Sequence, residues 1–417
     1  MKLQGLRRSG AVGGVVLFAL ALLLGGGSLR FPLTRLIVEL AASGVLIWYA
    51  LRGWRAPVDR WSAAAIILLL LIVLLPLVQI IPLPPSIWTT LPGHEDAASI
   101  MIAAGLAPQW MPLHASPAQR VLYGWVVVAM ALVGALLGLL QAGGSESFYI
   151  YDTGRFTAVT GLFANKNHHA DLLLIAILLT AALTTTGQKL GLRSPSRLVA
   201  AGVIIIFALA VPAANSRMGL LLLPVAILPA AALLLPRTYY HRLSLRSAAI
   251  TTAGLAMLVF VGARSGVVTR LLNRFEGDPD ARLKFWPDVL SAIDHYKPFG
   301  SGLGSFIKIF QRHESMGTLH FTYVFHAHND VMEIALEAGW AGIGLIILGV
   351  ALWLIGSWRV LQPSAWNAFT PVHVACFFGI TVLAAHSLVD YPLRTLGLAC
   401  VLAFLAGCLA PTDKAGG

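Results

Sequence analysis

The sequence predicts an all-α polytopic membrane protein of about 11–12 transmembrane helices, and its composition is the main reason. Of the 417 residues, 58% are hydrophobic and only 11% are charged, whereas soluble domains carry roughly 25% charged residues. The mean hydropathy is +0.79. Several apolar runs also reach the ~20 residues that an α-helix needs to cross a hydrocarbon core.

Apolar segments of this kind recur along the whole chain. The expected transmembrane helices are residues 10–27, 33–51, 62–83, 120–141, 170–187, 198–214, 217–236, 247–263, 330–356, 370–388 and 393–411. Residues 1–27 also resemble a signal peptide. They lack a convincing cleavage site, however, and further apolar segments follow directly, so we interpret them as the first span.

Basic residues in short connectors orient these helices. The formal net charge is +11, and short loops rich in Lys and Arg are typical of the cytoplasmic side. This rule puts the long loop 264–329 on the opposite side. Counting spans back from Lys189 places residues 142–169 outside, whereas counting forward from Arg60 through two spans places them inside. Either a twelfth or re-entrant crossing lies within 84–169, where the Pro- and Trp-rich stretch 84–118 suits an interfacial segment, or one expected span is wrong.

Nothing in the sequence indicates a nucleic-acid-binding protein or a zinc protein. The sequence has no basic-aromatic module for nucleic acid and no zinc-ligand spacing. Its three cysteines, Cys376, Cys400 and Cys408, lie in apolar segments and are interpreted as small core residues rather than a disulfide framework.

The loop 264–329 is the largest polar stretch, and loops of this length between spans are more often functional than idle. Apolar residues at helical spacing predict a helix over 280–296, with Asp278 or Asp280 as its cap. The glycine-dense stretch 298–305 must form turns. We expect a small helical cap over a membrane cavity. Its basic residues suggest an anionic ligand: Arg264, Arg270, Arg274, Arg282, Lys284, Lys297, Lys308 and Arg312.

The stretch 325–330 and the helix that it opens are the predicted reaction centre. Asp330, Glu333 and Glu337 fall at i, i+3 and i+7, so the three carboxylates share one face of the helix. His326 and His328 precede them. Ionisable groups at the mouth of a transmembrane helix are costly unless they line a wet cavity. His328 is our candidate general base, with Asp330 or Glu333 orienting a ring. A metal site or a purely structural histidine are the alternatives.

Two arginines are candidates for binding a diphosphate. Arg217 follows Asn215-Ser216 at the start of an apolar segment, and Arg282 lies one helical turn before Trp286. The planar guanidinium suits phosphate oxygens, so converging arginines would form a clamp. The alternatives are an interfacial arginine that snorkels at position 217 and a solvated one at position 282.

Two further polar segments each allow two interpretations. Asn165, Lys166 and Asn167 precede an apolar segment and offer amide and cationic donors, or they are only a helix entry with Asn167 as its cap. The turn 386–394 separates the last two spans. We expect a structural ion pair between Asp390 and Arg394 there, and only secondarily a ligand site.

These motifs together resemble the O-antigen ligase and O-antigen polymerase superfamily of bacterial envelope proteins. The resemblance runs from about Gly154 to Leu396 and rests on four motifs in order. They are Asn165-x-Asn167, Ser216-Arg217, the series Arg282, Trp286 and Pro298-x-Gly300-x-Gly302, and His328-Asn329 followed by Gly339 and Gly342.

The resemblance implies a mostly helical fold of the membrane glycosyltransferase (GT-C-like) type, with residues 1–141 as N-terminal transmembrane helices and 142–417 as the ligase-like domain. It implies transfer of a glycan from undecaprenyl diphosphate to an acceptor sugar at the periplasmic face of the inner membrane. In ligases, which act in lipopolysaccharide biosynthesis, the acceptor is the lipid A core. No metal or other cofactor is implied.

Within this resemblance, His328 is expected to be catalytic and Arg217 and Arg282 to bind the diphosphate. The supporting residues would be His326, Asn329, Asp330, Glu333, Asn165, Lys166, Asn167 and Trp286. A polysaccharide polymerase with the same chemistry is the alternative within the class, and a protein O-glycosyltransferase is a third member. A transporter or flippase is the alternative from another class, and the absence of an evident internal repeat argues against it.

Overall fold

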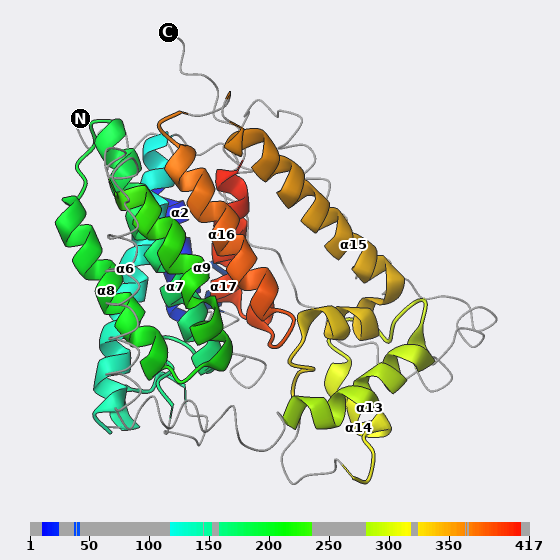
Figure 1. The fold of residues 1–417 in the computed structure, drawn as a ribbon. Coiled ribbons are helices and arrows are strands. Elements are labelled where there is room, and N and C mark those ends of the chain that lie inside the picture. The colour runs from blue at the N-terminus through cyan, green and yellow to red at the C-terminus, as the bar shows by residue number, and fades with distance from the viewer. Residues whose placement is uncertain are drawn as a thin grey trace, which may run out of the picture. The chain divides into compact units, whose positions relative to one another are not determined.

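The structure is a computed structural model of the chain (Figure 1). It describes residues 11–24, 37–38, 40–41, 117–144, 146–151, 158–235, 281–317, 324–362, 364 and 367–409. Every regular element within these ranges is a helix, which confirms the all-α prediction. The expected spans 62–83 and 247–263, nearly all of 33–51, the Pro- and Trp-rich stretch up to residue 116, and the loop from 264 to 280 lie outside the described residues.

The expected spans within the described ranges all form helices, whose ends differ from the predicted ones by a few residues. These helices are α2 (Ala11–Leu24), α6 (Pro117–Ala142), α7 (Lys166–Lys189), α8 (Arg197–Ala213), α9 (Arg217–Leu234), α15 (Asp330–Leu361), α16 (Thr370–His386) and α17 (Leu396–Cys408). In this part of the chain, four are long and apolar enough to cross a membrane: α6 from Arg120 onward, α7, α9 and α15. The chain is therefore a helical polytopic membrane protein.

The chain divides into two compact units. One unit comprises residues 1–120, 280–365 and 383–417, and the other comprises residues 121–279 and 366–382. The sequence predicted a ligase-like domain that begins at residue 142. The two compact units do not test this boundary, which stays a prediction.

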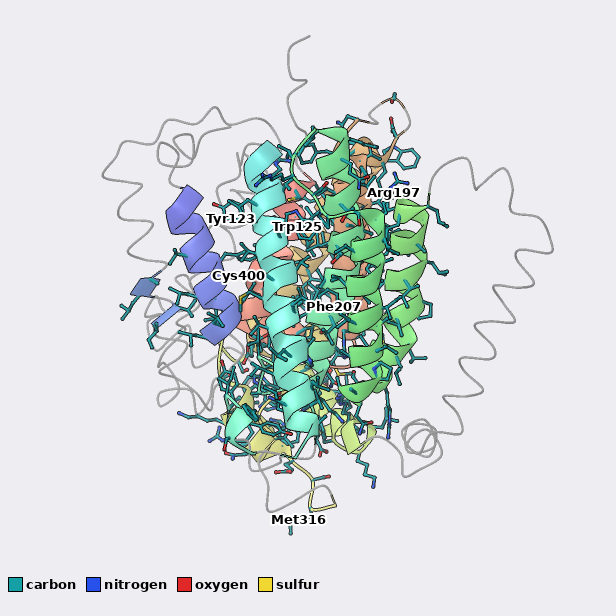
Figure 2. All side chains as sticks on the ribbon, turned by 90° about the vertical axis from the view of Figure 1, so that its left-hand side faces the viewer. Tyr123, Trp125, Arg197, Phe207, Met316 and Cys400 are labelled. Atoms are coloured by element: carbon teal, nitrogen blue, oxygen red, sulfur yellow. The ribbon has the colours of Figure 1, made fainter. Side chains whose placement is uncertain are left out.

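The unit that contains residues 121–279 is organised around α7. Leu172 to Leu179 are fully buried, and α8 and α9 both pack against the helix. Polar side chains within α7 can form hydrogen bonds to the backbone of the same helix. The Thr180 hydroxyl, for example, donates to the Ala176 carbonyl at 2.6 Å. Phe207 of α8, labelled in Figure 2, is fully buried. A helix that is apolar all round is expected in such a central position.

The other unit contains the helical loop that follows residue 280. The predicted helix over 280–296 is observed as α13 (Ala281–Tyr296), and a second, strongly amphipathic helix follows, α14 (Phe306–His313). Val289 of α13 and Phe306, Ile309 and Phe310 of α14 share one buried core with Leu336 of α15. This core fixes the loop helices to the start of α15. The turn after α14 extends away from them, and Met316 there is 88% exposed (Figure 2).

Helix α15 is broken at Gly339, which has φ 60° and ψ −151°. The residues before the break are the carboxylate-bearing turns, and the residues after it are apolar. Figure 1 shows the two parts of α15 running in different directions. The break therefore separates the predicted reaction centre from the apolar part of the helix.

Candidate active site

The break in α15 is stabilised by the glycine-rich turn 298–305. At the end of the first part of the helix, the Leu336 carbonyl accepts from the Ser301 amide at 2.8 Å and the Glu337 carbonyl accepts from the Gly302 amide at 2.9 Å. After the break, the Trp340 amide donates to the Pro298 carbonyl at 2.8 Å. A helix end leaves such groups unsatisfied, so the turn acts as a cap on both sides of the break.

Glycine is required where these two segments touch. A β-carbon on Gly339 would lie 2.2 Å from the Pro298 carbonyl oxygen, and one on Gly300 would lie 2.6 Å from the Glu337 carbonyl oxygen. Both glycines also have positive φ, which other residues rarely adopt. Gly339, the first glycine of the motif after His328, therefore contacts the Pro-x-Gly-x-Gly turn directly.

The segment before α15 is held by three further hydrogen bonds. Asn329 is the N-cap of the helix, and its side chain accepts from the Met332 amide at 3.0 Å. It also donates to the Leu388 carbonyl at 2.8 Å. Trp286 of α13 donates from Nε1 to the Ala327 carbonyl at 2.9 Å. Between these anchors His328 has φ 50°, an uncommon value for a residue with a β-carbon.

His328 and Asp390 form a half-buried dyad. Nδ1 of His328 lies 2.8 Å from Oδ1 of Asp390, and the Asp390 side chain is fully buried while that of His328 is 31% exposed. An ionised carboxylate only accepts hydrogen bonds. With Asp390 ionised, Nδ1 carries the proton and Nε2 presents a lone pair, which is the arrangement that a general base needs.

Two aromatic rings lie next to the His328 ring. The Tyr391 ring lies edge-on to it at a centroid distance of 4.8 Å, and the Phe285 ring lies 6.4 Å away. Tyr391 also stacks on His326 at 4.1 Å. Tyr391 thus contacts both histidines of the motif, a role that its position in the sequence did not indicate.

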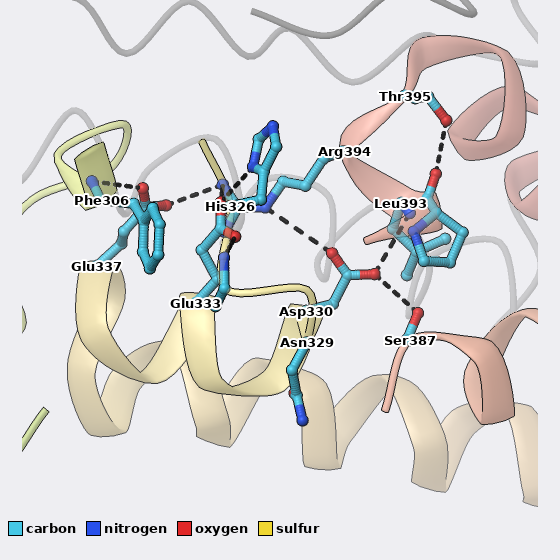
Figure 3. Close-up of polar contacts among 12 residues, drawn as sticks. Phe306, His326, Asn329, Asp330, Glu333, Glu337, Ser387, Leu393, Arg394 and Thr395 are labelled. Atoms are coloured by element: carbon cyan, nitrogen blue, oxygen red, sulfur yellow. Dashed lines mark hydrogen bonds and ion pairs between the residues drawn. The ribbon is translucent and has the colours of Figure 1, made fainter. Parts of the chain in front are cut away.

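His326 belongs to a second, deeper cluster. Its Nδ1 lies 2.9 Å from Oε1 of Glu333, and Oε2 of the same carboxylate accepts from the Ala327 amide at 2.8 Å. Asp330 accepts from the Ser387 hydroxyl at 2.8 Å. Figure 3 shows these contacts around the start of α15. The carboxylates therefore tie the histidine segment and the 386–394 turn to the helix.

Arg394 neutralises part of this cluster. Its Nη1 donates to Oε2 of Glu337 at 2.8 Å and lies 3.6 Å from Oε1 of Glu333, and its Nε lies 3.9 Å from Asp330 (Figure 3). Burial alone lowers the pKa of the Arg394 guanidinium, but the three carboxylates outweigh burial and hold that pKa above its ordinary value. The predicted carboxylate face is thus a binding face for one arginine.

One local prediction is wrong here, and another is confirmed for only one of the two histidines. Arg394 pairs with the carboxylates of α15, and Asp390 contacts His328, so the expected Asp390–Arg394 ion pair does not form. The reason is that Asp330, Glu333 and Glu337 offer Arg394 three carboxylates on one face. The predicted orienting carboxylate Glu333 does contact the ring of His326, whereas the ring of His328 is oriented by Asp390, which the sequence did not indicate for this role.

The predicted diphosphate residue Arg282 lies in the same unit as His328. Its Nη1 donates to the carbonyl of Val389, the neighbour of Asp390, and Arg282 lies on the same helix as Trp286 and Phe285. The structure therefore brings Arg282, Trp286, His326, His328, Asn329, Asp330 and Glu333 together around the start of α15.

Arg217 and the Asn165–Asn167 segment belong to the other unit. Ser216 caps α9 through the Gly219 amide at 3.1 Å, which makes Arg217 the first helical residue. Asn165 caps α7 through the Asn167 amide at 2.9 Å. The predicted cap Asn167 is therefore wrong: Asn165 has the extended backbone that a capping residue needs, whereas Asn167 already lies inside the helix.

The loop before α7 is held from α6 by Gln141, which the sequence did not indicate. Oε1 of Gln141 accepts from the amides of Thr160 and Gly161, both at 2.9 Å, and Nε2 donates to the Gly161 carbonyl at 3.2 Å. Gly161 has φ 56°, and a β-carbon there would lie 2.4 Å from the buried ring of His169. These contacts fix the backbone that leads into Asn165 and Lys166.

Comparison with known families adds one observation. Residues 201–347 match the family model described as O-antigen ligase. This part of the chain is therefore similar to O-antigen ligases. No curated protein sequence matches the chain. The family match indicates a glycosyltransferase-type activity on lipid-linked glycans.

The O-antigen ligase-like match covers only part of the site. It includes Arg217, Arg282 and His328, and it ends at residue 347, before Asp390 and Arg394. Within the described ranges, no three His, Cys, Asp or Glu side chains gather in a geometry that could hold a metal ion. Metal independence stays a prediction.

Proposed function

We propose that this O-antigen ligase-like protein is a membrane glycosyltransferase that transfers a glycan from undecaprenyl diphosphate to an acceptor sugar. The observation that supports it most directly is the His328–Asp390 dyad, because its partly exposed imidazole is held by a buried carboxylate. Among the acceptors of this class, the lipid A core is the one that we propose, which makes the protein an O-antigen ligase.

In the proposed reaction, Nε2 of His328 accepts the proton of the acceptor hydroxyl as its oxygen attacks the anomeric carbon of the glycan. The bond from that carbon to the diphosphate oxygen breaks, and undecaprenyl diphosphate leaves with the bonding electrons. His328 then releases the proton to solvent. Asp390 is a positioning residue, which fixes the tautomer of His328 and stabilises the imidazolium that forms.

Arg282 and Arg217 are proposed to stabilise the charge that develops on the departing diphosphate. The guanidinium of Arg282 reaches the carbonyl next to Asp390, so it is close to the dyad. For Arg217 the support is its place at the start of α9 within the matched family region. Because the leaving group is already a diphosphate, this chemistry needs no metal-binding carboxylate cluster.

Asn165, Lys166, Asn167 and Trp286 are proposed to support or bind the substrates, with His326, Asn329, Asp330 and Glu333 holding the dyad in place. We further propose that the site faces the periplasm at the bacterial inner membrane. The basic connectors on the other side of the apolar segments support this orientation. The lipid carrier would enter laterally between apolar helices.

The test is transfer from a synthetic undecaprenyl diphosphate glycan to lipid A core by the full-length protein in proteoliposomes, with EDTA present. The His328→Ala variant should lose roughly 10²–10⁴-fold in rate, the usual contribution of a general base. The control is His295→Ala, which changes an exposed histidine of α13. Full activity of His328→Ala would overturn the proposed base, and activity that EDTA abolishes would overturn metal independence.

The acceptor distinguishes a ligase from a polymerase, because both use the same site chemistry. A deletion strain of a ligase keeps carrier-linked polymer, whereas a deletion strain of a polymerase displays single repeat units. In the reconstituted assay a ligase elongates lipid A core and a polymerase elongates a second carrier-linked unit. A transporter or flippase would move the glycan without breaking its bond to the carrier.

A further inference from the structure

The apolar part of α15 carries an exposed face of regular spacing. Trp340, Gly344, Ile347, Ala351, Leu354 and Trp358 follow one another at alternating steps of four and three residues, so they line one side of the helix. Trp340 is 58% exposed, Ile347 is 63% exposed and Trp358 is 71% exposed. A continuous row of exposed apolar side chains, unlike single scattered ones, marks a contact surface.

Two features of this face indicate a lipid partner. Its two tryptophans are 18 residues apart, which is about 27 Å along an α-helix and close to the ~30 Å thickness of a hydrocarbon core. Trp is enriched at both membrane–water interfaces, where its ring sits at headgroup level. Arg359 follows Trp358 directly, and a basic residue at a helix end is typical of the cytoplasmic boundary.

A third aromatic residue lies at the level of Trp340. Phe299 is 52% exposed, and it lies in the turn whose Pro298 carbonyl accepts from the Trp340 amide at 2.8 Å. The turn and the helix are therefore joined at this level by a backbone hydrogen bond. The carboxylates and histidines of the site lie on the other side of Gly339.

We propose that the Trp340–Trp358 face of α15 contacts the lipid bilayer, with Trp340 and Phe299 in the headgroup region of one leaflet and Trp358 and Arg359 in that of the other. The break at Gly339 then marks the membrane surface, so that the histidine segment lies at headgroup level. The lipid contact rests on the spacing and exposure of this face. Its benefit for catalysis, presenting the carrier diphosphate at the depth of His328, rests on the function proposed above.

The test is a depth measurement by spin labels in proteoliposomes of phosphatidylethanolamine and phosphatidylglycerol. Single cysteines replace Phe299, Trp340, Ile347, Trp358 and, as a water-exposed reference, Met316. The parent chain gives the labelling background of its three cysteines, which are buried. Collisions with lipid-soluble oxygen and with a water-soluble nickel chelate then report depth.

The expected ratio of oxygen to nickel accessibility is highest at position 347, intermediate at 299, 340 and 358, and lowest at 316. A label at 347 that is as accessible to nickel as the one at 316 would overturn the proposal. So would a label at 347 shielded from both reagents, because protein would then cover this face, or a label at 340 as deep as the one at 347.

Transfer assays on the same preparations separate this proposal from the proposed function. Active protein with the wrong depth profile contradicts only the lipid contact. The expected profile in a protein whose parent chain transfers no glycan contradicts only the proposed function. The Ile347→Cys and Met316→Cys variants should transfer at the parent rate, since neither residue contacts the site. A loss of helical circular dichroism identifies any variant that fails to fold.

Discussion

Nδ1 of His328 lies 2.8 Å from Oδ1 of Asp390, although 62 residues separate them in the chain. The carboxylate is fully buried, and the imidazole is partly exposed. This arrangement suits catalysis, because the buried carboxylate orients a ring that stays partly exposed.

The first prediction concerns this dyad. Asp390→Asn should lower the rate of glycan transfer by roughly 10²–10⁴-fold, because the amide no longer enforces the tautomer of His328 that accepts a proton. The effect should fall on kcat rather than on KM for the donor. Steady-state kinetics in proteoliposomes measure both, together with the pH profile. Asp294→Asn, at an exposed position of α13, is the matched control. An Asp390→Asn variant with parental kcat and pH profile would rule out the positioning role.

The second prediction concerns the break in α15. Gly339→Ala should destabilise the protein by about 1–3 kcal/mol or more, because φ 60° with ψ −151° is a conformation that only glycine adopts readily. The new β-carbon would also meet the Pro298 carbonyl at 2.2 Å. The midpoint of thermal unfolding in detergent checks this. Gly344→Ala is the control, since a β-carbon at that position would have no neighbour within 4 Å. Equal midpoints for the two variants would contradict the requirement for glycine where α15 contacts the turn.

The third prediction concerns Arg394. Arg394→Leu leaves the carboxylates of Glu333 and Glu337 buried without their cation, and such a loss typically costs about 3–5 kcal/mol. Denaturation in detergent measures the cost. Arg312→Leu, at an exposed position of α14, should change stability by no more than about 0.5 kcal/mol. Adding Glu337→Gln to Arg394→Leu should recover part of the loss, since one buried charge is removed. A double variant less stable than Arg394→Leu alone would contradict this account.

The fourth prediction concerns the arginines proposed to bind the diphosphate. Arg282→Lys and Arg217→Lys should each lose more activity than the retained charge explains, because lysine lacks the planar fork that binds two phosphate oxygens. Initial rates at varied donor concentration measure the loss. Arg193→Lys, at an exposed position between α7 and α8, is the control for changing an arginine outside the loop 264–329. If the Arg217→Lys variant kept its full activity, Arg217 would only anchor the start of α9 at the membrane interface and would not bind the diphosphate.

The sequence by itself determined the features that depend on neighbouring residues. Apolar length predicted the helices, because a span must satisfy its backbone within itself. The i, i+3, i+7 spacing of Asp330, Glu333 and Glu337 placed three carboxylates on one face, since about 3.6 residues form each turn. The same local rules identified a cap at the start of α7 but assigned it to Asn167 instead of Asn165, because asparagine caps well at either position.

Only the tertiary structure decided how distant segments pair. The sequence offered Asp390 and Arg394 to each other as neighbours on one turn, but packing gives the carboxylate to His328 and the guanidinium to the face of α15. Periodicity describes one element at a time, whereas a buried charge pairs with whichever opposite charge the fold brings within reach. For the same reason, the contact of Gly339 with Pro298 is visible only once the turn lies against the helix.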